Sequence, residues 1–203
     1  MIGAILSGGE NKRIPVLKGF LSIEGRPIIE RSIDVLRKVF DRVVISTNMP
    51  ERYFSLGMPL VGDIRKEKGP MIGILSVLVA TGEDAIFVVA CDMPFINEKL
   101  IRYMVEKHRT ECTEQGAGNY DATIPVFRSY KEPLFGIYAR SAVQRMESLI
   151  GNGQRSLADM LAHLRVKYIA EQEVRAVDPE GESFVNINTM EDYERIGGKT
   201  CLV

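Results

Sequence analysis

The residues best suited to chemistry lie near the start of the chain. Ser7, Gly8 and Gly9 follow a short apolar stretch, and Arg13 and Lys18 come soon after. Adjacent glycines allow the backbone to approach a ligand closely and to turn successive N–H groups toward it. Basic side chains beside such a loop offset negative charge on the ligand. The combination favours a polyphosphate ligand, with a plain turn after a strand as the alternative.

The spacing of this loop excludes the two common nucleotide motifs. A Walker loop needs Gly-Lys-Ser/Thr at the start of a helix, and the dinucleotide turn needs Gly-x-Gly-x-x-Gly. The loop contains neither pattern. The loop therefore predicts a phosphate site of another class. For Arg13, the alternative to a role in that site is a surface salt bridge.

Three further polar residues, Asn48, Asp63 and Asp92, each follow an apolar stretch. Asp92 follows the most apolar of these stretches, Ala85–Ala90, with one residue, Cys91, between them. Magnesium prefers oxygen ligands and usually takes one or two protein carboxylates, so Asp92 is the candidate metal ligand. The alternatives are a capping or turn residue for Asp92 and a solvated loop acid for Asp63.

The apolar pattern predicts a fold that brings these residues together. Strands alternating with helices at this spacing indicate a parallel sheet that is wrapped by helices on both faces. Ligands bind at the carboxyl ends of such strands, so we expect residues 7–9, Asn48, Asp63 and Asp92 along one edge. The predicted strands are 2–6, 43–46, 59–61 and 85–90, and the predicted helices are 27–40, 71–80 and one that Asn97 caps.

The later half of the chain elaborates the same sheet. Stretches 121–127 and 133–138, joined by a polar link, predict an antiparallel hairpin. At 203 residues the chain is long enough for one well-buried core and short for two, so we expect a single domain over residues 1–203. The other elements predicted here are helices at 140–150 and 156–164, strands at 166–170 and 174–177, and a last helix at Met190 capped by Thr189.

Composition and charge exclude several classes of protein. A formal net charge of −1 provides no field for nucleic acid or for an anionic membrane. No apolar run approaches the ~20 residues of a membrane helix, and the chain opens with a strand instead of a signal segment. We therefore expect a cytoplasmic protein. Cys91, Cys112 and Cys201 are scattered, which indicates reduced thiols and argues against a disulfide framework or structural zinc.

A series of short motifs resembles the molybdenum cofactor guanylyltransferase family from end to end. The resemblance implies a doubly wound, mostly parallel, Rossmann-like nucleotidyltransferase sheet with helices on both faces. It also implies transfer of GMP from GTP to molybdopterin, release of pyrophosphate, and magnesium as cofactor. The motifs are Leu6-Ser7-Gly8-Gly9, Arg13 with Lys18, Gly69-Pro70 after Asp63, Cys91-Asp92-Met93-Pro94, Glu132-Pro133-Leu134-Phe135 and Asn186-Ile187-Asn188-Thr189.

The resemblance also implies roles for single residues. About the first 108 residues would bind the nucleotide, and residues from about 120 onward would bind the acceptor. Asp92 would hold magnesium, and Lys18, Asp92 and Arg13 would be catalytic. Asn186 and Asn188 would lie on the acceptor side. The nucleotide would contact Leu6, Ser7, Gly8, Gly9, Lys18, Asn48, Asp63 and Asp92.

Two positions depart from the family pattern, and several functions stay open. Pro15 replaces the usual glycine and Leu17 the usual aspartate, which changes the phosphate loop. Another nucleotidyltransferase of this fold could use CTP or a sugar 1-phosphate, and a non-catalytic nucleotide-binding protein is a further alternative. A nicotinamide oxidoreductase is disfavoured by the missing dinucleotide turn. In the family interpretation the partners are GTP, molybdopterin and a molybdenum-insertion protein that delivers the pterin.

Overall fold

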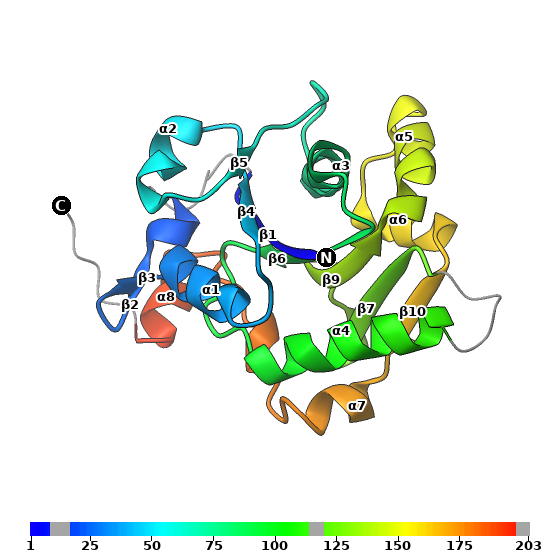
Figure 1. The fold of residues 1–203 in the computed structure, drawn as a ribbon. Helices are drawn as coiled ribbons and strands as arrows, with labels where there is room; N and C mark the ends of the chain where they lie inside the picture. The colour runs from blue at the N-terminus through cyan, green and yellow to red at the C-terminus, as the bar shows by residue number, and fades with distance from the viewer. Residues whose placement is uncertain (9–16, 114–119, 198–203) are drawn as a thin grey trace.

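A computed structural model describes residues 1–8, 17–113 and 120–197 of the protein, with the backbone alone for residues 111–113. Within these residues eight strands form one sheet, in the order β10-β7-β9-β6-β1-β4-β5 with β8 paired to β7 (Figure 1). Strands from both halves of the chain thus share the sheet. Their bounds are β1 Ile2–Leu6, β4 Val43–Ser46, β5 Leu60–Val61, β6 Ala85–Ala90, β7 Ala122–Phe127, β8 Tyr130–Lys131, β9 Phe135–Ala139 and β10 Val166–Ile169.

Most neighbouring strands run parallel. β1 is parallel to β4 and β6, β4 to β5, and β7 to β10. β9 is antiparallel to both β6 and β7, which confirms the antiparallel pairing expected for the later half. Every residue of β1 and β6 is buried, because these central strands are covered on both faces. The mostly parallel sheet predicted from the sequence is confirmed.

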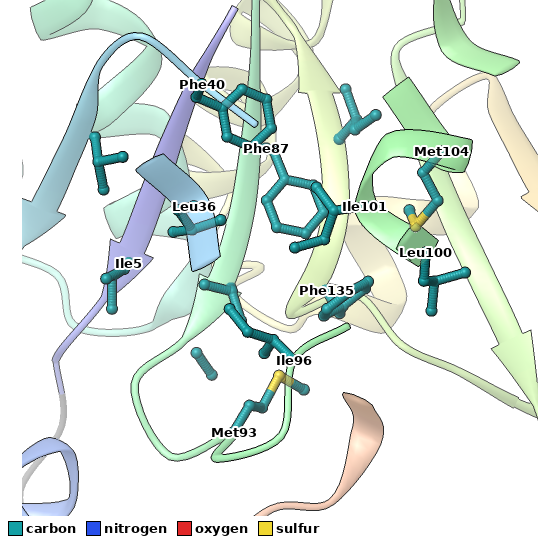
Figure 2. Close-up of a cluster of buried hydrophobic side chains, with 14 of the residues drawn as sticks. Ile5, Leu36, Phe40, Phe87, Met93, Ile96, Leu100, Ile101, Met104 and Phe135 are labelled. Carbon is teal, nitrogen blue, oxygen red and sulfur yellow. The ribbon is translucent and has the colours of Figure 1, made fainter. Parts of the chain in front are cut away.

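Helices cover both faces of the sheet (Figure 1). Along β6, Phe87 and Val89 point into one apolar cluster, while Ile86 and Val88 point into the other. Figure 2 shows Phe87 in the first cluster, which α1 and α4 complete. On the opposite face α3, α5 and α6 complete the second cluster. These helices are α1 Ile28–Arg37, α4 Glu98–Thr113, α3 Pro70–Thr81, α5 Val143–Gly151 and α6 Leu157–His163.

The remaining elements are short. None of the helices in the described ranges is long and apolar enough to cross a membrane. The short helices are α2 Pro50–Tyr53, α7 Glu171–Arg175 and α8 Met190–Arg195, with 3-10 turns at Lys18–Phe20, Phe54–Leu56, Arg140–Ala142 and Glu182–Phe184. Two further strands, β2 Ser22–Ile23 and β3 Arg26–Pro27, form a separate antiparallel pair.

The strand predicted at residues 174–177 is wrong, because this segment lies in and just after helix α7. The Glu173 carboxylate accepts a hydrogen bond from the Ala170 N–H at 3.0 Å, which caps the start of the helix. Val174 is buried and Val177 is partly buried in the same cluster. Two apolar residues three positions apart are typical of one helix face, and the pattern was too short to be told from a strand.

The C-terminal part of the chain is anchored beside the segment that follows Lys18. Leu21 and Ile23 share a small apolar cluster with Ile187 and Tyr193. The Tyr193 hydroxyl group donates to the Ser22 carbonyl oxygen at 2.6 Å. Thr189 caps α8, as predicted, by accepting from the Asp192 N–H at 3.1 Å. The cluster therefore holds the turn before α8 close to the start of the chain.

Candidate active site

A cavity of about 710 Å³ opens at the carboxyl ends of β1, β4 and β6. This volume suits a nucleotide-sized ligand. A smaller hollow of about 340 Å³ beside α4 contains none of the predicted site residues. The larger cavity brings together eight of them, namely Leu6, Ser7, Gly8, Lys18, Asn48, Asp63, Asp92 and Asn188.

Backbone hydrogen bonds fix the centre of the cavity. The Ser7 N–H donates to the Ser46 carbonyl oxygen at 2.8 Å, and the Cys91 N–H donates to the Leu6 carbonyl oxygen at 3.0 Å. The parallel ladder therefore extends one residue beyond the strands and holds Ser7 and Cys91 in the wall of the cavity. Burial raises the pKa of the Cys91 thiol to about 11, so this side chain stays a neutral thiol near pH 7.

Asn48 and Asp63 form a hydrogen-bonded pair at one end of the cavity. The Asn48 Nδ2 donates to Asp63 Oδ2 at 2.5 Å, and the Asp63 N–H donates to Asn48 Oδ1 at 2.8 Å. The two bonds fix which way the Asn48 amide points. The remaining amide N–H and carboxylate lone pairs can bind donors and acceptors of a nucleobase or a ribose.

Lys18, Asp92 and Asn188 meet at the other end. The Lys18 Nζ lies 2.9 Å from Asp92 Oδ2 and 3.0 Å from Asn188 Oδ1. The Ile187 N–H also donates to the Asp92 carbonyl oxygen at 3.1 Å. The Lys18 and Asp92 side chains are 20% and 17% exposed, so both remain accessible to a ligand. This end offers a cation, a carboxylate and an amide to a charged group.

The start of helix α3 adds positive potential to the same cavity. Gly69 precedes the helix, Pro70 is its first residue, and both line the cavity together with Lys68. The first N–H groups of a helix favour anions. Gly73 allows a close approach of α3, because a Cβ atom there would lie 3.2 Å from Ser46 Oγ. Two lysines and a helix start therefore favour a phosphate-bearing ligand.

The residues present fit a divalent cation that is shared with the ligand. No group of three or more His, Cys, Asp or Glu side chains that could hold a metal occurs in residues 1–8, 17–113 and 120–197. Asp92 contributes one carboxylate, and Lys18 contacts its Oδ2 atom. Magnesium in nucleotide sites takes one or two protein carboxylates and completes its shell with phosphates and water. Asp92 suits that role, whereas a site built from protein ligands alone is not supported here.

The strand order separates the two ends of the cavity. Asp63 follows β5 and Asp92 follows β6, with β4 and β1 between these strands. Neighbouring strands are about 4.8 Å apart, so the two carboxylates follow strands roughly 14 Å apart. An elongated ligand that carries a polar base at one end and phosphates at the other matches this arrangement.

A comparison with known proteins identifies the family. Residues 3–168 match the model of the MobA-like NTP transferase domain. The chain is 34% identical over 191 residues to the molybdenum cofactor guanylyltransferase of Syntrophotalea carbinolica, covering 94% of this chain and 88% of that protein. It is 32% identical over 197 residues to the same enzyme of Desulfosudis oleivorans, covering 95% and 92%. The chain belongs to the molybdenum cofactor guanylyltransferase family. It is therefore a nucleotidyltransferase, as the motifs predicted.

Solved structures agree with the membership of this family. Molybdopterin-guanine dinucleotide biosynthesis protein A from Archaeoglobus fulgidus superposes with a TM-score of 0.81 at 29% identity, covering 97% of this chain and 96% of that one. A nucleotidyl transferase from Methanothermobacter superposes with a TM-score of 0.65 at 18% identity, covering 97% and 95%. The second likeness shows the fold alone. The doubly wound nucleotidyltransferase fold predicted from the sequence is thus confirmed.

The three other predicted site residues of this guanylyltransferase-family chain are Gly9, Arg13 and Asn186. Gly9 and Arg13 lie outside the described residues. The Asn186 side chain donates from Nδ2 to the Phe184 carbonyl oxygen at 3.1 Å and is not among the described residues that line the cavity. Its neighbour Asn188 does line it. The role predicted for Asn186 stays a prediction.

Several residues of the cavity were not predicted from the sequence. Tyr53 and Lys68 line it from the first half of the chain, and Leu134 lines it from the later half. Leu134 belongs to the motif Glu132-Pro133-Leu134-Phe135, so this motif could have predicted a residue that lines the cavity. Tyr53 ends a four-residue helix, and the residue that it contacts, Ser7, lies 46 positions away. No local pattern in the sequence signals such a contact.

Proposed function

We propose that this protein transfers the GMP part of GTP to the phosphate group of molybdopterin and releases pyrophosphate. One observation carries the proposal. A single cavity holds the Asn48–Asp63 pair at one end and the Lys18–Asp92–Asn188 group at the other. The first group suits a base and the second suits phosphates, and the motif order and the family membership agree with this assignment.

Guanine is the base that suits the Asn48–Asp63 pair. It presents two adjacent N–H donors, at N1 and at the 2-amino group, and a carboxylate accepts such a pair. Cytosine, adenine and uracil lack these two adjacent donors. A polar site that loses its water when a ligand binds rejects a ligand that leaves its groups unpaired. Asp63 is therefore the residue to which we assign the choice of base.

The transfer step needs positioning and charge neutralisation more than a base. A phosphate oxygen of molybdopterin attacks the α-phosphorus of GTP, and a new phosphorus–oxygen bond forms. The bond from the α-phosphorus to the bridging oxygen breaks, and its electron pair leaves with pyrophosphate. The attacking phosphate is already ionised, so no proton has to be removed. Lys18 contributes a point charge to the phosphates, and the cavity holds the reacting groups in line.

A divalent cation accompanies the nucleotide in enzymes of this type. We assign magnesium to Asp92 because its carboxylate lies beside Lys18 at the phosphate end. When bound, magnesium neutralises charge on the phosphates. Asp92 and Lys18 hold each other in place, and the turn from Ile187 to Asn188 supports Asp92 through its backbone.

The acceptor enters from the side of the cavity where Asn188 and Leu134 lie. Asn188 contacts Lys18, so the acceptor segment and the phosphate site share a residue. Asn186 is the second acceptor residue of this proposal. We also propose that the protein acts in the cytoplasm and that a molybdenum-insertion protein delivers the pterin to it.

The test measures nucleotide binding and pyrophosphate release separately. Calorimetry with magnesium and each of GTP, ATP, CTP and UTP should show the tightest binding for GTP. Pyrophosphate release should then require molybdopterin. Asp63→Asn should weaken GTP binding about tenfold and reduce the preference for GTP. Asp34→Asn, which removes an exposed carboxylate paired with Arg26, is the control.

Each result has a distinct meaning. A preference for CTP would reject guanylyl transfer and keep the fold and the reaction class. Tight GTP binding without pyrophosphate release in the presence of molybdopterin would favour a non-catalytic nucleotide-binding protein. An unchanged GTP preference in Asp63→Asn would remove that residue from base recognition.

A further inference from the structure

A buried pair of hydroxyl groups lies in the wall of the cavity. The Tyr53 hydroxyl oxygen lies 2.5 Å from Ser7 Oγ. Ser7 is 4% exposed and Tyr53 is 1% exposed, and both line the cavity. Ser7 follows β1, which lies between the strands of the base end and of the phosphate end. The pair is thus placed beside the middle part of a bound nucleotide.

The chemistry of the two groups decides which of them donates. Burial raises the pKa of Tyr53, so the phenol keeps its proton. A phenol is a stronger acid than an aliphatic hydroxyl group and is therefore the better donor of the two. The Ser7 hydroxyl group then retains its own proton for another acceptor. The Cys91 sulfur lies close to it but is a weak acceptor.

We propose that Tyr53 is a positioning residue for the nucleotide. Its hydroxyl group donates to Ser7 Oγ and thereby directs the Ser7 hydroxyl group as a donor to the ribose–α-phosphate part of the nucleotide. This inference rests on the proposed function for the identity of the ligand. The ribose–α-phosphate part is chosen because β1 lies between β4, which leads to Asn48, and β6, which leads to Asp92.

The Tyr53 ring also touches the segment that carries the catalytic lysine. Its centroid lies 5.2 Å from that of Phe20, the last residue of the turn that begins with Lys18. One side chain thus contacts both the loop after β1 and the Lys18 turn. Tyr53→Phe removes the hydroxyl group and keeps this ring contact, so it isolates the effect on Ser7.

A double-mutant cycle tests the proposal. GTP affinity by calorimetry and kcat/KM for pyrophosphate release are measured for Tyr53→Phe, Ser7→Ala and the double variant. Each single change should weaken GTP binding about five- to tenfold, and the double variant should be no weaker than Ser7→Ala. The same pattern is expected with GMP, which keeps the ribose and the α-phosphate. Tyr103→Phe is the matched control, because its hydroxyl group donates to Glu173 Oε1 at 2.7 Å and does not line the cavity.

The outcomes separate this inference from the proposed function. Wild-type affinity in Tyr53→Phe, or losses that add in the double variant, would overturn it. Normal GMP binding in both single variants would also overturn it, because the contact would then lie beyond the α-phosphate. A melting temperature that falls with no change in GTP affinity would make Tyr53 purely structural. If the cycle holds in GTP binding but no GMP is transferred by the wild type, the inference stands and the proposed function fails.

Discussion

The two halves of the chain contribute very unequally to the cavity, although both contribute strands to one sheet. Of the described residues that line the cavity, all but Leu134 and Asn188 come from residues 1–108. The first half, to which we assign nucleotide binding, pairs its polar side chains with one another inside the cavity, as in Asn48–Asp63 and Ser7–Tyr53. Its recognition groups are therefore already held in place before a ligand binds, which lowers the entropy lost on binding.

The later half uses its buried charge for a different purpose. Asp121 is fully buried immediately before β7 and binds Arg145 at 2.8 Å and Arg165 at 3.3 Å. Burial acts to raise the pKa of this carboxyl, but the hydrogen bonds from Ser141 and Arg165 hold the pKa below its usual value. This cluster joins β7 to α5 and to the segment before β10. In the later half, the buried charge therefore stabilises packing. Of its described residues, Leu134 and Asn188 line the cavity.

The largest effect is expected at the phosphate end of the nucleotide half. Asp92→Asn keeps the shape of the side chain and removes its charge, so turnover should fall about a hundredfold or more through loss of the cation. The free energy of unfolding should change by about 1 kcal/mol or less, because the pair with Lys18 is partly exposed. Pyrophosphate release over a magnesium titration and thermal unfolding are the measurements.

The same experiment can contradict the role of Asp92. Asp41→Asn, at an exposed aspartate before β4, is the control and should behave like the wild type. Near-normal turnover of Asp92→Asn at low magnesium would remove this carboxylate from the mechanism. A collapse of the melting temperature would instead make it structural.

Lys18→Ala should have the next largest effect. The Lys18 ammonium group is the cation that contacts both Asp92 and Asn188, so its loss removes charge at the point where the halves meet. We expect kcat/KM for GTP to fall about ten- to a hundredfold with little change in stability. Lys38→Ala is the control, since Lys38 is 62% exposed and pairs with Glu98. If Lys18→Ala kept wild-type GTP affinity and turnover, the glycine loop would have no role in phosphate binding and would be a plain turn.

The asparagine pair tests how the acceptor half acts. Asn188→Ala should lower kcat/KM about three- to tenfold, for molybdopterin and for GTP alike, because Asn188 Oδ1 also holds Lys18. Asn186→Ala should leave GTP affinity unchanged, since the Asn186 amide donates to the Phe184 carbonyl oxygen. Steady-state kinetics with each substrate varied in turn are the measurement. If Asn188→Ala and Asn186→Ala lowered kcat/KM for GTP equally, Asn188 would not be the only link between the acceptor segment and the phosphate site.

The sequence predicted the site to the extent that local patterns determine it. Asn48 and Asp92 follow the buried strands β4 and β6, Asp63 follows the half-buried β5, and parallel strands bring their carboxyl ends to one edge. The cap at Thr189 could likewise be predicted, because it depends on a contact with Asp192, three positions further along the chain. The Tyr53–Ser7 contact and the Lys18–Asn188 contact could not be predicted, because they depend on packing between distant segments. Residues 174–177 were misassigned, because the Glu173 cap and the burial of Val174 outweigh a two-valine pattern.

The smallest effect on turnover is expected from Glu132, which precedes β9 in the later half and acts on stability. Burial raises the pKa of this carboxyl to about 7, in contrast to the paired Asp121. The folded protein therefore binds the Glu132 proton more tightly than the unfolded chain does. Between about pH 4.5 and pH 7 the unfolded chain loses this proton first, so the contribution of Glu132 to the free energy of unfolding falls as pH rises. Above about pH 7 both states are ionised and the destabilisation is constant.

Glu132→Gln removes this titration and should therefore change stability in a pH-dependent way. Near pH 4 the variant and the wild type should have about the same free energy of unfolding, because the wild-type carboxyl is protonated in both states. Near pH 8 the variant should be more stable by about 1–2 kcal/mol, a value reduced from the full linkage because Glu132 is partly exposed. Chemical denaturation at several pH values measures this difference, with the exposed Glu106→Gln as control. If the difference in the free energy of unfolding between variant and wild type stayed the same from about pH 4 to pH 8, the pKa of Glu132 would not be raised by folding. The contrast between Glu132 and the paired Asp121 would then be wrong.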